Sequence, residues 1–338
     1  MPDREHHEST KGRTGFSGAR TMGSRFGAAS RAMVALVLSA ALALGLCPSW
    51  AGIVPQAQAA DSIDGWYVEI EDGYAYILSA LNHDRENPIV VPSKVGDYPV
   101  KGLRDNAQPG FIWSRKDPVS VVVSEGIESI GSGVFHTEEC ISSVTLPSTL
   151  KSIGSWALGS ISLTSISFPE GIETWGEYIL SGNEQLTDVH LPLDMTAIPK
   201  GTFVNCVSLT SLSIPSGVTS FGESAFRGTG FESFTVPTSV TSMGEQVLSY
   251  CANLQSAAVP GSVKALPAMA FYQDESLTEI VLGEGMTSIG AEAFSECRKL
   301  KSVYIPASMT FIDKDAFPGL SSMTVHYGGT EAQWRQLL

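Results

Sequence analysis

Apolar and polar positions along this chain follow a pattern that repeats about every 23 residues from Pro92 toward the C-terminal end. The clearest copy, Leu209–Phe226, reads LTSLSIPSGVTSFGESAF, and a full copy follows L-x-x-I-x-L-P-x-x-V-x-x-I-G-x-x-A-F. Aligned on the residue that ends the first apolar stretch, the copies fall at Pro92, Ser124, Pro147, Pro169, Pro192, Pro215, Pro237, Pro260, Gly283 and Pro306. Every step after Ser124 is 22 or 23 residues. A fixed period of this length is typical of a solenoid, in which each copy forms one coil.

Each coil is expected to contain two short strands. The apolar positions Leu212 and Ile214 alternate with polar ones and predict a first strand, which Pro215 ends because proline cannot donate to a strand ladder. Val218 and Phe221 predict a second, shorter strand, followed by a compact turn. One coil cannot bury its apolar face alone, so the coils must stack and share a core. We therefore predict a mostly-β solenoid of about ten coils of 22–23 residues.

The two ends of the array carry different patterns. Residues 66–78 alternate in polarity around Asp72-Gly73, which predicts a β-hairpin that closes the open end of the stack. Thr330 and Gln333 form a capping box that opens a short C-terminal helix. We expect a signal peptide at 1–59, a β cap at 60–88, the solenoid at 89–325 and a C-terminal cap at 326–338.

The N-terminal segment resembles an export signal. Arg20, Arg25 and Arg31 precede the apolar run Ala32–Leu46, and Ala57–Ala59 offers a small-x-small cleavage site. The run is about 15 residues, shorter than the roughly 20 that a membrane span needs. We expect an exported protein, extracellular or at the cell surface, with no integral membrane span after removal of the signal.

Alternatives for this segment stay open. The positive region is long, so Met22 or Met33 are alternative starts, and a retained signal anchor is the main alternative to cleavage. A lipoprotein signal at Cys47 is rejected, because Leu46 stands where a small residue is needed.

Charge narrows the range of partners. Residues 1–59 hold six Lys/Arg and three Asp/Glu, so the remainder carries 15 basic and 32 acidic residues and a net charge of −17. Such a surface repels phosphate backbones and anionic lipids, which argues against nucleic-acid and membrane-surface partners.

The repeat resembles the BspA-like (Treponema pallidum-type) leucine-rich repeats of bacterial surface proteins. Phe203–Phe226 and Phe294–Phe317 carry the likeness most clearly, Ile89–Ala107 resembles that family's first repeat, and His326–Trp334 its closing segment. Gly283 departs from the pattern, since the other late copies have proline there. The resemblance implies a leucine-rich-repeat solenoid and an adhesin or surface-exposed binding protein.

The cysteines follow the repeat. Cys206, Cys251 and Cys297 occupy the same position two coils apart, so their Cα atoms should lie about 9–10 Å apart, beyond disulfide reach. We predict buried thiols in a structural ladder and no metal site. Cys140 is two places out of register and is predicted to be the most exposed of the four.

No constellation of catalytic residues stands out. His83, His136, His190 and His326 lie in distant segments, and a linear stack gives no reason for them to converge. We find no phosphate loop, zinc-binding helix motif or calcium loop. We therefore predict that the protein is not an enzyme and has no cofactor.

The outward face of the first strands is the remaining place for function. Its central position runs through Val122, Thr145, Ser167, His190, Ser213, Thr235, Ala258, Val281, Tyr304 and Thr324. The neighbouring position runs through Ser120, Ser143, Ser165, Asp188, Ser211, Ser233, Ser256, Glu279, Ser302 and Ser322. Small hydroxyls dominate both rows, so the candidate binding residues are the exceptions Asp188, His190, Glu279 and Tyr304. Trp156 is expected at an outward turn and Trp175 in the core, and neither is predicted to be a ligand platform.

The sequence bears on three classes of function. The first is a secreted or cell-surface adhesion protein that binds protein or glycan macromolecules, such as host extracellular matrix, through many weak polar contacts on its repeat face. The alternative is a structural spacer or assembly module of the cell envelope with no host ligand. An enzyme is disfavoured, because no cluster of convergent titratable residues is evident.

Overall fold

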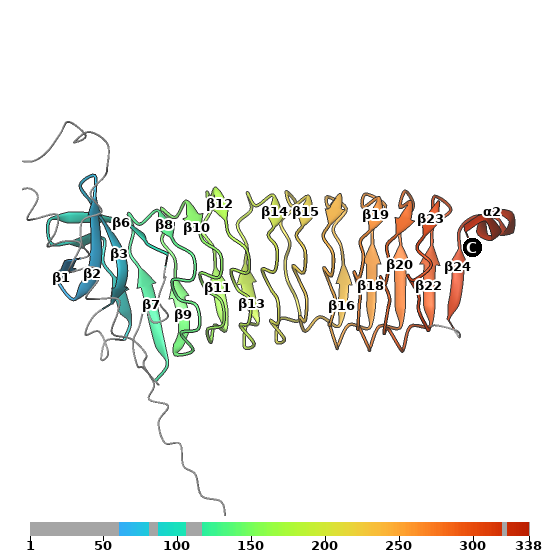
Figure 1. Cartoon of the computed structure of the whole chain (residues 1–338), viewed down its shortest axis with the longest axis horizontal. Helices are drawn as coiled ribbons and strands as arrows, with labels where there is room; N and C mark the ends of the chain where they lie inside the picture. The colour runs from blue at the N-terminus through green and yellow to red at the C-terminus, as the bar shows by residue number, and fades with distance from the viewer. Residues whose placement is uncertain (1–60, 81–86, 106–116, 320–322, 338) are drawn as a thin grey trace, which may run out of the picture. The chain divides into compact units, whose positions relative to one another are not determined.

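The computed structural model of the chain describes residues 61–80, 87–105, 117–319 and 323–337. The predicted signal peptide and His83 lie outside these residues. Within the unit Ala57–Leu338, successive coils follow one another from the blue N-terminal strands to the red C-terminal helix (Figure 1). The structure confirms a mostly-β solenoid of about ten coils.

An antiparallel hairpin begins the described chain. The N-terminal strands are β1 (Asp61–Ile63), β2 (Trp66–Glu71), β3 (Tyr74–Ala80), β5 (Lys94–Val95) and β6 (Tyr98–Leu103). Asp72 and Gly73 join β2 to β3 with φ angles of 52° and 80°, the positive pair that a two-residue hairpin turn requires. β3 then pairs in parallel with β6. The predicted hairpin is therefore present, and it extends one sheet of the solenoid.

We call the first strand of each coil the front strand and the second the back strand. The front strands are β4 (Ile89–Val91), β7 (Val119–Val123), β9 (Ile141–Thr145), β11 (Ser165–Ser167), β13 (Asp188–His190), β16 (Ser233–Thr235), β18 (Ser256–Val259), β20 (Glu279–Leu282), β22 (Ser302–Ile305) and β24 (Thr324–Tyr327). The back strands are β8 (Ser129–Ile130), β10 (Ser152–Ile153), β12 (Thr174–Trp175), β14 (Ala197–Ile198), β15 (Ser220–Phe221), β17 (Ser242–Met243), β19 (Ala265–Leu266), β21 (Ser288–Ile289) and β23 (Phe311–Ile312). We call the front strands together the front column and the back strands together the back column, and the strands that pair within each column are parallel.

The turns that follow the back strands form a third hydrogen-bonded column. Phe203 N donates to Ala225 O and Phe226 N to Val247 O, each at 2.9 Å. The turns use left-handed backbone at two positions per coil. The first position is held by Gly133, Trp156, Tyr178, Gly201, Ser224, Gln246, Met269 and Glu292. The second is held by Thr137, Ser160, Gly182, Asn205, Gly228, Tyr250, Gln273, Glu296 and Gly319.

Phenylalanines at equivalent turn positions stack along the core. The rings of Phe203 and Phe226 lie 5.6 Å apart at 5°, and those of Phe271 and Phe294 lie 5.6 Å apart at 3°. All four side chains are fully buried. In both pairs the two rings come from neighbouring coils, so the hydrophobic core is continuous from one coil to the next.

The front column is interrupted twice. Its sheets are β4-β7-β9, β11-β13 and β16-β18-β20-β22-β24, and Ser211–Ile214 belongs to none of them. Both 22-residue steps, Pro147 to Pro169 and Pro215 to Pro237, fall at interruptions. A 22-residue step does not by itself prevent pairing, because β22 and β24 pair across one, Ser302 with Thr324. The front strand predicted at Leu212–Ile214 is wrong, although this copy has the clearest repeat sequence.

The back column is interrupted at two other places, between β12 and β14 and between β17 and β19. In the paired coils the residue after the back strand donates to the preceding coil, as Gly222 N does to Ile198 O and Gly244 N does to Phe221 O, both at 2.8 Å. Pro199 and Pro267 occupy this position in the two unpaired coils. Because proline has no N–H, that ladder bond cannot form.

The C-terminal end closes with the predicted helix, α2 (Glu331–Leu337). Thr330 N donates to Gln333 Oε1 at 2.8 Å, and Gln333 N donates to Thr330 Oγ1 at 3.3 Å, which is the capping box. Trp334 packs against Tyr327 with ring centroids 5.3 Å apart. The helix is thereby attached to the last front strand.

Candidate functional site

The four predicted binding residues lie on front strands, as expected, but not as one group. Asp188 and His190 lie on β13, with His190 Nδ1 3.6 Å from Asp188 Oδ2. Glu279 on β20 pairs with Ser302, whereas Tyr304 on β22 pairs with Val281. Glu279 and Tyr304 are therefore on different rungs of neighbouring strands.

Tyr304 has an aromatic partner that the sequence reasoning missed. Its ring stacks on His326 of β24 at 4.4 Å and 11°. The expected neighbour, Thr324, instead pairs with Ser302. The sequence pattern places His326 in the C-terminal cap. However, His326 follows Tyr304 by 22 residues, which is one of the two step lengths between neighbouring coils. With Val281, which is 41% exposed, Tyr304 and His326 form an apolar patch on the outward face.

Asp188 and His190 border a groove, which we call the central groove. It is lined by Asp188–Leu191, Leu193 and Ser211–Ser216, and its volume is about 540 Å³. It lies where the front column is interrupted between β13 and Ser211–Ile214. Because this segment joins no sheet, Leu212 and Ile214 are only partly buried, while their counterparts in paired coils, such as Ile280 and Leu282, lie in the core.

Leu193 is the most unusual residue of the central groove. Its side chain is 79% exposed. Equivalent positions in the other coils hold polar or small residues, namely Glu125, Ser148, Glu170, Ser216, Thr238, Gly261, Glu284 and Ala307. The Glu170 carboxylate accepts hydrogen bonds from Leu193 N at 3.0 Å and Asp194 N at 3.2 Å. The turn that presents this leucine to solvent is thus held in place by the preceding coil.

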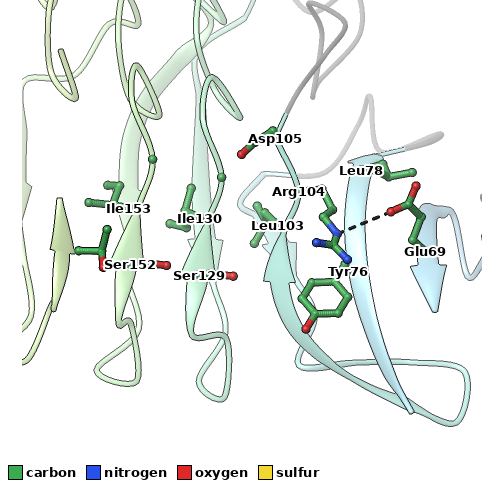
Figure 2. A pocket seen from close by; sticks show the side chains of 13 residues that line it. Glu69, Tyr76, Leu78, Leu103, Arg104, Asp105, Ser129, Ile130, Ser152 and Ile153 are labelled. Atoms are coloured by element: carbon green, nitrogen blue, oxygen red, sulfur yellow. Dashed lines mark ion pairs between the residues drawn. The ribbon is translucent and has the colours of Figure 1, made fainter. Parts of the chain in front are cut away.

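A second hollow, of about 560 Å³, lies where the hairpin meets the back strands, and we call it the cap hollow (Figure 2). Figure 2 shows Arg104 between Tyr76 and Glu69. The guanidinium carbon lies 4.1 Å from the Tyr76 ring centroid, Nε lies 3.6 Å from Glu69 Oε2, and the group also pairs with Glu71. Since the cation is already engaged by two carboxylates and a ring, it attaches the hairpin to the coils and leaves no free charge for a ligand.

A stack of aromatic rings on the turn column was also missed. Trp156 and Tyr178 occupy the same turn position in consecutive coils, and their rings stack at 4.5 Å and 8°. His136 packs against Trp156 at 5.1 Å, and its Nδ1 lies 3.0 Å from Gly159 O. Trp156 is outward, as predicted, but the stack covers its faces, so it stabilises the turns. Trp175, predicted in the core, is partly buried and packs edge-on against Phe168 at 5.1 Å.

The cysteine ladder is confirmed. Cys206, Cys251 and Cys297 are fully buried, and their Sγ atoms donate to Leu180 O, Phe226 O and Phe271 O at 3.3, 3.3 and 3.0 Å. Burial raises the pKa of the Cys206 thiol to about 12, and it raises the pKa of the other two thiols as well. Such thiols are neutral and unreactive at neutral pH. Cys140 is partly exposed, as expected.

One buried carboxyl interrupts this ladder. Asp274 is fully buried, its Oδ1 accepts from Cys251 N at 2.7 Å, and its Oδ2 has no hydrogen-bond partner. Desolvation raises its pKa well above the ordinary aspartate value. Asn183 occupies the same ladder position four coils earlier. Asn183 accepts from Leu163 N and donates to Leu158 O and Leu180 O, so an amide satisfies this position better than a carboxylate.

The described residues offer no catalytic or metal arrangement. His136, His190 and His326 lie in separate coils, and within residues 61–80, 87–105, 117–319 and 323–337 no three His, Cys, Asp or Glu side chains gather as a metal site. Nor does that part of the chain contain a helix long and apolar enough to cross a bilayer.

Comparison with known proteins agrees with the architecture. The family model described as the BspA type leucine rich repeat region matches residues 113–229 and 196–324, in six copies. Among solved structures, the pneumococcal vaccine antigen PcpA has a TM-score of 0.53 and 17% identity, over 80% of this chain and 76% of that one. That likeness supports the fold.

Two further solved structures are more distant in geometry. A leucine rich cell surface protein from Faecalibacterium prausnitzii A2-165 has a TM-score of 0.44 and 19% identity, over 85% of this chain and 98% of that one. The Treponema pallidum leucine rich repeat protein has a TM-score of 0.36 and 19% identity, over 72% and 91%. No curated protein matches the chain. The family model covers more than half of the sequence, and the chain therefore belongs to the BspA type leucine rich repeat family.

Proposed function

We propose that this chain is a non-enzymatic binding protein, secreted or exposed at a bacterial surface, whose outward front face engages protein or glycan macromolecules. The observation that carries the proposal is that large exposed side chains gather at two places on a face otherwise made of small hydroxyls. One is the central groove with Asp188, His190 and Leu193, and the other is the patch of Tyr304 and His326.

The two places are suited to simultaneous contact. They are five coils apart, from the Pro192 copy to the Pro306 copy, which corresponds to roughly 24 Å at about 4.8 Å per strand. Two weak contacts at fixed separation on one macromolecule reinforce each other without further contacts, because the second becomes intramolecular. The negative charge of the chain favours partners with cationic segments.

Binding of the purified protein to immobilised extracellular-matrix proteins and glycans tests this proposal. We expect saturable binding that falls about tenfold in Asp188→Ala/His190→Ala and about tenfold in Tyr304→Ala/His326→Ala, with a larger loss when all four changes are combined. The control Thr145→Ala alters the same outward row on β9, two coils before His190, and should bind as the unaltered protein does. Absence of saturable binding, together with self-association into regular arrays, would replace the proposal with an envelope spacer.

A further inference from the structure

One arginine in the described part of the chain has no carboxylate partner. Arg104, Arg298 and Arg335 each form an ion pair with at least one glutamate. Arg227 forms none with any residue that the structure describes, although the whole chain has a formal net charge of −14. The guanidinium of Arg227 is therefore a cation whose charge the fold itself does not neutralise.

An aromatic ring holds this guanidinium in place. Its Cζ lies 4.3 Å from the centroid of the Tyr250 ring. Its Nε is buried without a hydrogen-bond acceptor, whereas its terminal nitrogens reach the surface. A ring face attracts a cation but does not replace a carboxylate as a hydrogen-bond acceptor. Arg104 lies over Tyr76 in a similar way but has two carboxylates in addition, so only Arg227 keeps its terminal N–H groups open to a ligand.

Three consecutive coils of the turn column contribute to this cluster. Tyr272 packs against Tyr250 with ring centroids 5.5 Å apart at 57°, and Gln273 Nε2 donates to Tyr272 Oη at 3.4 Å. The backbone beneath the rings is fixed, because Asn205 N donates to Arg227 O and Tyr250 N donates to Tyr272 O, both at 2.8 Å. We call Arg227, Tyr250 and Tyr272 the arginine–tyrosine strip.

The chemistry of the strip indicates what it can bind. Tyrosine and arginine are enriched at the centres of protein interfaces. Tyr250 is 38% exposed, and Arg227 and Tyr272 are partly exposed. A guanidinium without a partner pairs best with a carboxylate, through charge-assisted hydrogen bonds. The net negative charge of the chain repels a polyanion, so a single carboxylate beside an apolar group fits the strip better than a highly charged chain does.

We propose that the arginine–tyrosine strip binds an Asp or Glu side chain of a partner protein that has an aromatic or apolar residue beside it. The carboxylate pairs with the terminal nitrogens of Arg227, and the neighbouring side chain packs against Tyr250 and Tyr272. The strip lies on the turn column, whereas the central groove and the Tyr304–His326 patch lie on the front column. The inference therefore adds a second binding surface to the protein and goes beyond the proposed function.

Hippurate, which joins a carboxylate to an aromatic ring through an amide, serves as the first probe. The Nε–Hε signal of Arg227 in the isotope-labelled protein reports binding by nuclear magnetic resonance, and its loss in Arg227→Lys assigns it. We expect a saturable shift of this signal, half-complete at a hippurate concentration on the order of 10 mM. Hippuramide, in which a neutral amide replaces the carboxylate, should cause no such shift. Absence of a saturable shift with hippurate, or an equal shift with hippuramide, would overturn the proposal.

Glucuronate, the second probe, separates a protein carboxylate from that of an acidic glycan. It carries a carboxylate on a sugar ring and has no aromatic group. We expect it to bind about fivefold more weakly than hippurate, because it lacks the ring that packs against Tyr250 and Tyr272. Glucuronate binding as tight as that of hippurate would contradict a protein ligand and would assign the strip to acidic glycans.

Matched variants assign the roles within the strip, with saturation transfer to the hippurate ring as the measure of affinity. Arg227→Gln should weaken hippurate binding at least about tenfold, because the charge-assisted pair is lost. Tyr250→Leu should weaken it about threefold, because an apolar side chain remains but the ring face does not. The control Arg298→Gln removes a guanidinium that is already paired with Glu296 and should bind as the unaltered protein does.

Unchanged hippurate binding by Arg227→Gln would reject the site. If that variant does not fold, the comparison of hippurate with hippuramide still decides the question on the unaltered protein. The front-face variant Tyr304→Ala/His326→Ala should keep its hippurate binding, so the outcome at the strip is read separately from the outcome for the proposed function.

Discussion

The C-terminal coils and the central coils have the same repeat pattern but different sheets. From β16 to β24 the front strands form one continuous parallel sheet, whereas Ser211–Ile214 stands unpaired between β13 and β16. All steps between Pro237 and Pro306 are 23 residues, and the step from Pro215 to Pro237 is 22. The repeat pattern therefore predicts which residues face the core but not which neighbouring strands pair, because β22 and β24 pair across a 22-residue step whereas β13 and Ser211–Ile214 do not pair across a 23-residue step.

The largest expected contrast between the two regions lies in their cores. Phe294→Ala should lower the free energy of unfolding by about 3–5 kcal/mol, because it empties a fully buried site between two stacked rings. Leu212→Ala should cost only about 1 kcal/mol, because the leucine is already partly exposed. Denaturant unfolding followed by circular dichroism measures both. Equal losses would mean that the central segment is packed as tightly as the C-terminal coils.

A smaller change in the free energy of unfolding is expected at the buried carboxyl of Asp274. Asp274→Asn should raise the free energy of unfolding at pH 7 by about 1–3 kcal/mol, because it removes a buried carboxyl whose Oδ2 has no hydrogen-bond partner, at a position where Asn183 shows that an amide can be satisfied.

The pH dependence of this effect has a defined sign. The folded-state pKa of Asp274 is raised, so the folded protein binds more protons than the unfolded chain and stability falls as pH rises above the unfolded value of 3.8. Asp274→Asn should lose this contribution to the pH dependence of the free energy of unfolding. The free energies of unfolding of the variant and the unaltered protein should differ least below about pH 4. Unfolding curves between pH 4 and 8 measure it, with Asn183→Asp as the reciprocal control that should introduce the same slope. A parallel dependence in Asp274→Asn and the unaltered protein would contradict the assignment.

The smallest expected change in stability is at the interruptions of the back column. Pro199→Gly restores an N–H facing Trp175 O, for a gain of about 1 kcal/mol, but a more flexible unfolded chain offsets a similar amount. The free energy of unfolding should therefore change by less than about 1 kcal/mol. Hydrogen exchange should nevertheless show a newly protected amide at residue 199. An unprotected amide there would mean that proline is not what separates β12 from β14.

Much of the fold follows from the sequence because local chemistry recurs in register. The turn at Asp72-Gly73, the capping box at Thr330 and the cysteine ladder each depend on a few neighbouring residues or on the period itself. The interruptions of the back column also leave traces in the sequence, at Pro199 and Pro267. An alignment of the coils on their apolar positions alone does not take these two prolines into account.

The candidate site was less accessible to sequence reasoning. Asp188 and His190 stand out in the sequence because they are large polar residues among serines, but the central groove depends on strands that do not pair. The stacking of Tyr304 on His326 required the register of the last coil, which lies at a change from repeat to cap. Leu193 looks ordinary in a chain rich in leucine, but alignment of the coils distinguishes it, because the equivalent positions hold polar or small residues.

The interruptions of the two columns are staggered along the stack. Where β9 and β11 do not pair, β10 and β12 do, and where β12 and β14 do not pair, β11 and β13 do. The same holds around Ser211–Ile214, where β14, β15 and β17 stay paired, and between β17 and β19, where β16 and β18 are paired. In a linear array the weakest junction between neighbours sets where cooperative unfolding divides. Because a ladder crosses each of these junctions, a pulling force along the stack meets no junction between neighbouring coils that lacks paired strands.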